Sequence, residues 1–95
     1  MEKKLFESIY IVRDTDTKEE YKEIFEEIKE RVSKFKIEKV EEIGRKRLAY
    51  PVKENEFGYY ILIEFYAETK ENITELETYC RQNDNILKWI FVDKD

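Results

Sequence analysis

The order in which two kinds of hydrophobic pattern follow one another limits the folds that this chain can adopt. Apolar residues recur at helical spacing in two stretches, and the four segments around them are rich in β-branched and aromatic residues, as strands are. With two glycines and one proline in 95 residues, the chain has little material for loops. We therefore expect six long elements in the order strand, helix, strand, strand, helix, strand.

The first strand is expected from Leu5 to Val12, where both faces carry apolar side chains. A polar turn follows, and in it Thr17 and Glu20 fit a capping box, since a hydroxyl and a carboxylate can satisfy the free amides at a helix start. The apolar stripe that comes next predicts an amphipathic helix. This stripe consists of Tyr21, Ile24, Phe25, Ile28, Val32 and Phe35.

A long strand, or one bent arm of a hairpin, is expected from Ile37 to Val52. Gly44 predicts a bulge or bend in it, and Pro51 predicts a sheet edge or strand end, because proline cannot donate to the ladder. A polar turn at residues 53–56 leads to the next strand, from Gly58 to Ala67. Its side chains alternate between two faces, with Tyr59, Ile61, Ile63 and Phe65 on one and Tyr60, Leu62, Glu64 and Tyr66 on the other.

The last part of the chain predicts a second helix and a final strand. Thr69 can cap this helix, and the Asn-Asp-Asn sequence at residues 83–85 ends it. The final strand is expected from Ile86 to Val92. The apolar stripe of the helix consists of Ile73, Leu76, Tyr79 and Cys80.

This order predicts an α+β, ferredoxin-like βαββαβ fold as one domain over residues 1–95. One four-stranded antiparallel sheet would carry both helices on a single face and leave the other face open. An open face with apolar and aromatic side chains needs a partner, either a protein or RNA. The residues expected on or near it are Ile9, Ile11, Tyr60, Leu62, Tyr66 and Ile90.

Composition argues against catalysis and against bound metals or cofactors. The chain has no histidine, so the usual acid–base group at neutral pH is missing. Cys80 is the only cysteine, which rules out an intrachain disulfide and the usual zinc site, and its helical spacing favours a buried structural thiol. Gly44 and Gly58 stand alone and form no phosphate loop. We expect a cytoplasmic protein without a signal peptide, a membrane span or a small-molecule substrate.

The charge pattern leaves two interpretations of one basic run open. A net charge of −5 counts against nucleic-acid binding, yet Arg45, Lys46 and Arg47 are consecutive and have no acid among them. Along a strand, Arg45 and Arg47 share one face and Lys46 takes the other. The run could be a charged edge that discourages aggregation, or a strand that grips phosphates with Tyr50 beside it.

The same stretch resembles a known family. Residues 38–53, Glu-Lys-Val-Glu-Glu-Ile-Gly-Arg-Lys-Arg-Leu-Ala-Tyr-Pro-Val-Lys, followed by Gly58-Tyr59-Tyr60, are similar to the second and third strands of the bacterial small-subunit ribosomal protein S-six family. Family members carry a glycine, basic residues, Leu-Ala-Tyr and usually Pro-Ile, and Val52 stands in the isoleucine position. The aromatic-Glu start at Phe6 and the Asp-Asn-Ile sequence after Arg81 are also similar to the family.

The resemblance implies a non-enzymatic component of the small ribosomal subunit. It would bind the central domain of 16S ribosomal RNA as a heterodimer with ribosomal protein S-eighteen, whose basic charge would compensate for the acidic charge of this chain. The apolar residues of the open face would hold this partner. By position, the residues expected to contact RNA are Arg45, Lys46, Arg47, Tyr50, Lys3, Lys4, Arg81 and Lys88.

Three alternatives share the predicted strand order. An RNA-recognition-motif protein that binds single strands would need a Gly-aromatic-small-aromatic pattern in its third strand. Here the bulky Tyr60 stands where a small residue is needed, and Ile61 stands where an aromatic residue is needed. A regulatory or acylphosphatase-like domain would need an anion loop, which the sequence lacks. A homo-oligomer using the open sheet face would leave the basic run as a soluble edge.

Overall fold

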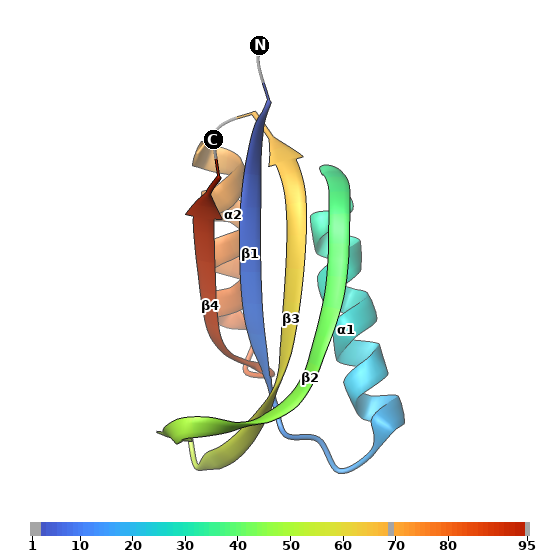
Figure 1. Ribbon diagram of the computed structural model, residues 1–95, viewed down its shortest axis with the longest axis vertical. Helices are drawn as coiled ribbons and strands as arrows, with labels where there is room; N and C mark the ends of the chain where they lie inside the picture. The colour runs from blue at the N-terminus through green and yellow to red at the C-terminus, as the bar shows by residue number, and fades with distance from the viewer. Residues whose placement is uncertain (1–2, 69, 95) are drawn as a thin grey trace.

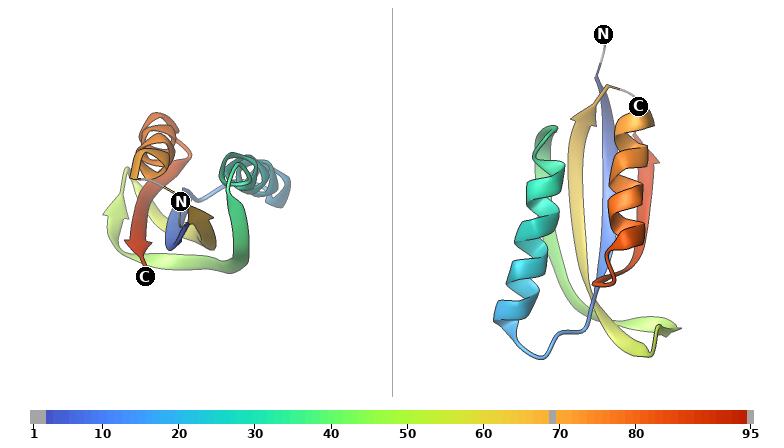
Figure 2. Two further views of the ribbon diagram at one scale, coloured as in Figure 1. Left: turned by 90° about the horizontal axis from the view of Figure 1, so that it is seen from above. Right: turned by 180° about the vertical axis from the view of Figure 1, so that it is seen from behind.

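The computed structural model describes residues 3–68 and 70–94 and shows six elements in them (Figure 1). The four strands form one antiparallel sheet in the order β2-β3-β1-β4. Both helices lie on the same face of this sheet (Figure 2). The predicted α+β, ferredoxin-like βαββαβ fold is therefore confirmed. The elements are β1 (Lys4–Arg13), α1 (Lys18–Val32), β2 (Lys36–Val52), β3 (Asn55–Ala67), α2 (Lys70–Gln82) and β4 (Ile86–Asp93).

The two central strands divide their side chains between a buried face and an open face. In β1, Phe6, Ser8, Tyr10 and Val12 are buried, whereas the residues between them are only partly buried. In β3, Ile61, Ile63 and Phe65 are fully buried and complete this side of the sheet. The helices cover the buried face with the predicted stripes, except that Phe35 lies beyond the end of α1 and Tyr79 is only partly buried; both pack against the core. The buried helix residues are Tyr21, Ile24, Phe25, Ile28 and Val32 in α1 and Ile73, Leu76 and Cys80 in α2.

The start of α1 confirms half of the predicted capping box. The Glu20 amide donates a hydrogen bond of 3.1 Å to the Thr17 hydroxyl, which is the N-cap of the helix. The Glu20 carboxylate does not complete the box, because it forms an ion pair with Arg13 instead. The proposed cap at Thr69 lies outside the described residues. In the described part of the chain, neither helix is long and apolar enough to cross a membrane.

β2 is an edge strand that ends in a projecting hairpin. Gly44 has φ +110° and lies at a register shift against β3, which confirms the predicted bulge. The expected four-residue turn at residues 53–56 is wrong, since only Lys53 and Glu54 form the turn, both with positive φ. A two-residue turn of this kind matches the twist of paired strands, so β3 begins at Asn55 rather than Gly58.

Gly58 is required by the close packing of β3 against β1. A Cβ atom at this position would lie 2.7 Å from the Ile11 Cγ2 atom and 3.1 Å from the Val12 carbonyl oxygen. The Leu48 side chain, which is buried, would be 3.6 Å away. The missing side chain of Gly58 therefore lets the base of the hairpin pack on β1.

We expect Gly58→Ala to lower the free energy of unfolding by about 1–3 kcal/mol through overpacking. The loss should be smaller in an Ile11→Ala background, because that change removes the nearest colliding atom. Gly44→Ala is the matched control: a Cβ there meets nothing within 4 Å, so its cost would come from the positive φ alone. Urea unfolding of Ile11→Ala, of the two glycine variants and of the two double variants with Ile11→Ala checks this. If Ile11→Ala rescued both glycine variants equally, the expectation would be contradicted.

Tyr10 buries a hydroxyl group that has no hydrogen-bond partner of normal geometry among the described residues. Burial raises the pKa of Tyr10, and the neighbouring Ser8 hydroxyl offsets this only partly. The Ser8 hydroxyl itself donates to the Ile63 carbonyl oxygen at 2.8 Å. Since an unpaired buried polar group costs free energy, the Tyr10 hydroxyl weakens a core that its ring helps to fill.

Replacing Tyr10 with phenylalanine should leave stability unchanged or raise it by about 1 kcal/mol, because the ring remains and the unpaired hydroxyl is removed. Tyr21→Phe is the control, since the Tyr21 hydroxyl donates to Glu42 at 2.9 Å, and it should cost about 1 kcal/mol. Chemical denaturation compares the two. An equal loss in both variants would mean that a bound water satisfies Tyr10.

Candidate RNA and protein interfaces

The hairpin arm, residues 45–57, carries four of the residues predicted to contact RNA. Figure 1 shows it turning across one end of the sheet toward the side of β4. Arg45, Lys46, Arg47 and Tyr50 are all exposed along it, and the Tyr50 side chain is 65% exposed. The register places Arg45 opposite Tyr59, Lys46 opposite Gly58 and Arg47 opposite Phe57, as the expected alternation requires.

Arg45 is held in place by two neighbours. Its Nε and Nη2 atoms donate to the Asp14 carboxylate at 2.9 and 2.8 Å, and its guanidinium carbon lies 4.0 Å from the centre of the Phe57 ring. These hydrogen bonds keep the pKa of Asp14 below its usual value. The Asp14 amide also donates to the Asn55 side chain at 3.3 Å. The loop after β1 therefore contacts both strands of the arm and fixes its direction.

Arg13 connects the same end of the sheet to the loop before β4. Its Nε atom donates to the Asn85 side-chain oxygen at 2.7 Å, and its amide donates to the Asn85 carbonyl at 2.8 Å. Its guanidinium also pairs with Glu20 at the start of α1. Sequence reasoning missed Arg13 and Asp14 as organising residues. The only local signal was a pair of opposite charges at the end of a strand.

Lys46 and Arg47 differ from Arg45, because neither forms an ion pair with another described residue. Lys88 lies on the other edge strand, in the same row across the sheet as Gly44: it pairs with Ile11, which pairs with Tyr60, which pairs with Gly44. The last turn of α2, which contains Arg81, lies toward the same end of the molecule (Figure 2). The structure thus brings six of the eight predicted RNA-contact residues to one end.

Lys3 and Lys4 do not join this group. Lys4 pairs with Ala67 at the opposite end of the sheet, seven residues along β1 from Ile11, which corresponds to roughly 23 Å. Its ammonium lies 3.8 Å from the Asp93 carboxylate. A single RNA site at the hairpin arm would therefore not include these two lysines.

The residues predicted to bind a partner protein share the open face of the sheet. Ile9 lies between Leu62 and Ile90 in the register, and Ile11 lies next to Tyr60. Val92 lies on the same face and extends this surface. We call the surface formed by Ile9, Ile11, Tyr60, Leu62, Ile90 and Val92 the apolar strip. Ile90 and Val92 are each 46% exposed. Tyr66 lies farther along the same face, and the Lys36 ammonium is 5.9 Å from its ring.

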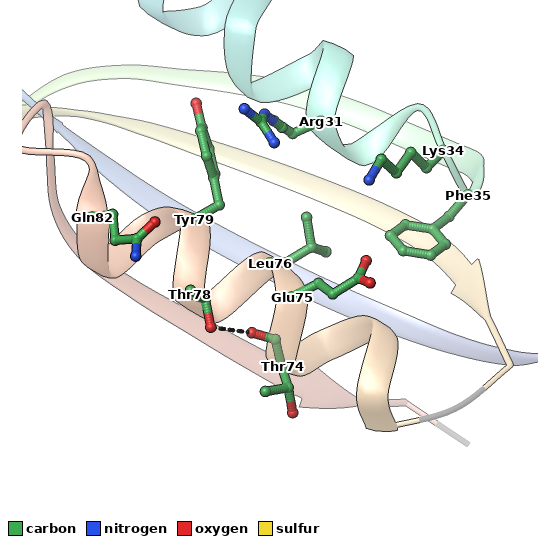
Figure 3. A pocket seen from close by; sticks show the side chains of 9 residues that line it. All are labelled: Arg31, Lys34, Phe35, Thr74, Glu75, Leu76, Thr78, Tyr79 and Gln82. Carbon is green, nitrogen blue, oxygen red and sulfur yellow. Dashed lines mark hydrogen bonds between the residues drawn. The ribbon is translucent and has the colours of Figure 1, made fainter.

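A groove of about 380 Å³ separates the two helices on the other side of the sheet (Figure 3). Arg31 of α1 faces Tyr79 of α2 across it, with the guanidinium 4.8 Å from the ring centre. The Tyr79 hydroxyl donates to Glu27 at 2.9 Å. Thr78 only donates to its own helix, at the Thr74 carbonyl. The contacts of Tyr79 with Arg31 and Glu27 therefore join the two helices.

Cys80 is buried, in agreement with the predicted structural thiol. Burial raises the pKa of Cys80 to about 12, with a smaller contribution from Glu77, so the thiol stays protonated at neutral pH. Among residues 3–68 and 70–94, no three His, Cys, Asp or Glu side chains group in a way that could hold a metal ion.

The pKa of Asp14, measured by NMR titration of its carboxyl carbon, should lie below the ordinary value of about 3.9 and rise toward it in Arg45→Gln. Because folding lowers this pKa, the ion pair stabilises the fold at pH values above the ordinary pKa of aspartate. That contribution is lost as the pH falls through the lowered pKa. Lys46→Gln is the control and should leave the titration unchanged. Equal Asp14 pKa values in wild type and Arg45→Gln would show that the pair does not form in solution.

Comparison with known proteins shows which family the chain is similar to. The family model described as "Ribosomal protein S6" matches residues 5–93. The small ribosomal subunit protein bS6 of Shouchella clausii is 35% identical over 92 residues, which is 95% of each chain. That of Sulfurovum sp. is 33% identical over 89 residues, covering 92% of this chain and 69% of the relative.

A solved structure agrees with the sequence comparisons. The crystal structure of the 30S ribosomal protein S6 from Thermotoga maritima superposes with a TM-score of 0.88 at 29% identity, covering 98% of this chain and 89% of that one. The chain therefore belongs to the ribosomal protein S6 family, the S-six family that its second and third strands resemble, and is a non-enzymatic component of the small ribosomal subunit in the cytoplasm.

Proposed function

We propose that this chain binds the central domain of 16S ribosomal RNA as a heterodimer with ribosomal protein S-eighteen. The observation that carries the proposal is the separation of two unlike surfaces. The hairpin arm presents cations and an exposed tyrosine, and the apolar strip lies on the open face of the sheet. One surface suits phosphates and the other suits a protein, so both partners can be bound at once.

Lys46 and Arg47 are the strongest candidates for phosphate contact on the arm. Neither has an ion-pair partner among the described residues, so RNA would not have to displace one. Arg45 uses two donor atoms on Asp14, and the rest of its five N–H donors remain for a phosphate. Tyr50 can stack on a base or donate a hydrogen bond beside them. The arm would thus offer one cation held by an ion pair and two that have no such pair among the described residues.

The open face favours a protein partner over stacked bases. Its centre is aliphatic, with Ile9, Ile11, Leu62 and Ile90, whereas base stacking uses aromatic rings. The net charge of −5 also weakens long-range attraction to RNA. A basic protein on this face would supply that attraction, which is why we place S-eighteen there.

The test is a titration of the central-domain 16S RNA fragment with this chain, with and without purified S-eighteen, at two salt concentrations. We expect tight, salt-sensitive binding only when both proteins are present. Changing Arg45, Lys46 and Arg47 together to alanine should weaken binding by the heterodimer and reduce the salt slope by roughly one unit for each lost phosphate contact.

The matched control replaces three exposed lysines of the helical side, Lys18, Lys22 and Lys34, with alanine and so removes the same charge. It should leave the salt slope unchanged. Both triple variants should fold, which circular dichroism verifies. An unchanged slope in the arm variant would sink the phosphate-contact assignment, and no binding by any mixture would sink the heterodimer.

A further inference from the structure

The open face carries one row of charge beside the apolar strip. Glu7 of β1 and Glu64 of β3 lie directly opposite each other in the register. Their side chains are only 23% and 16% exposed. Two carboxylates placed face to face on neighbouring strands repel each other, so this row needs a cation.

In the free protein that cation is Lys94. Its Nζ atom lies 3.2 Å from the Glu7 carboxylate and 3.3 Å from the Glu64 carboxylate. Its amide donates to the Leu5 carbonyl oxygen at 2.9 Å, which keeps the residue beside the sheet just after β4 ends. The two carboxylates raise the pKa of Lys94, Glu7 most strongly, so it stays charged.

One ammonium does not neutralise the row, because two carboxylates and one lysine leave a net charge of −1. Lys39 is the neighbour of Glu64 on β2, but its ammonium lies 3.7 Å from the Glu41 carboxylate and is already paired there. The row therefore keeps an excess of negative charge while the face is open to water.

A partner that covers the apolar strip also covers this row. Ile9 lies two residues after Glu7 in β1, and Leu62 lies two residues before Glu64 in β3, on the same face. Covering them removes water from carboxylates that are already mostly shielded, and a buried carboxylate without a partner is strongly unfavourable. The covering surface must therefore bring positive charge to this position.

We propose that the partner protein places an arginine or lysine side chain between Glu7 and Glu64, and that Lys94 occupies this position until the partner binds. This inference rests on the proposed heterodimer, whose partner it defines by chemistry: an apolar surface with one cation beside it. Arginine suits the site best, because its planar guanidinium can bind both carboxylates. The Lys94 side chain is 40% exposed, so moving it aside costs little.

A second copy of the chain suits this face less well. A symmetric dimer would bring the same surface against itself. The two rows would then add carboxylates to carboxylates in a site that loses water. A basic partner is therefore the better occupant.

The experiment is calorimetric titration of purified S-eighteen into the wild type and three variants. Glu7→Gln/Glu64→Gln keeps the shape of the row and should weaken binding at least tenfold. Lys94→Gln removes the competing ammonium and should tighten binding several-fold. Glu23→Gln/Glu30→Gln, on the exposed side of α1, removes the same charge as the first variant and should bind as the wild type does. Urea unfolding verifies that each variant is folded.

The other possible outcomes would each contradict a particular statement of the proposal. Binding of S-eighteen by the wild type and equally by Glu7→Gln/Glu64→Gln would overturn this inference and leave the heterodimer standing. Weaker binding by Lys94→Gln would show that Lys94 contacts the partner rather than giving way to it. No binding by the wild type would overturn the heterodimer and this inference together. A wild-type dimer in sedimentation that S-eighteen cannot dissociate would show that a second copy occupies the face.

Discussion

The pairing of β1 with β3 is the interaction on which the rest of the structure depends. Ten consecutive residue pairs join the two strands without a register shift, from Lys4 with Ala67 to Arg13 with Gly58. Because neighbouring side chains on a strand point to opposite faces, this one register decides which residues the helices cover and which stay open. A slip of β1 by one residue would turn Glu7 toward the helices and move Phe6, Tyr10 and Val12 to the open face.

Both candidate interfaces derive from this pairing, although they differ in chemistry. On the open face it aligns the apolar strip and the carboxylate row. At the end of β1 it delivers Arg13 and Asp14, whose contacts with Asn85, Arg45 and Asn55 fix the loops and the hairpin arm. The arm can project because its own register with β3 breaks after Arg47. The regular β1–β3 pairing therefore positions an irregular, charged element, and the register shifts of the sheet lie in the pairings with the two edge strands.

The features that the sequence could predict are those encoded in neighbouring residues. Alternation in β1 and β3, the stripes of both helices and the bulge at Gly44 all follow from local spacing. Three features lie beyond that reach. The Asp14–Arg45 pair joins residues 31 positions apart, the Lys53-Glu54 turn uses positive φ in residues that rarely adopt it, and the carboxylate row exists only once the register is known. The separation of Lys3 and Lys4 from the arm likewise becomes visible only in the register of β1.

The position of β1 in the sheet also sets a limit on when the protein can fold during its own synthesis. β1 is made first, yet its two neighbours are β3 and β4, and its pairing with β4 extends to Asp93. Only the β2–β3 hairpin joins strands that are adjacent in the chain, so it can form early. The core beneath β1 has to wait for the last strand. Until then β1 lacks one of its two partner strands, and the growing chain depends on rapid completion or on protection.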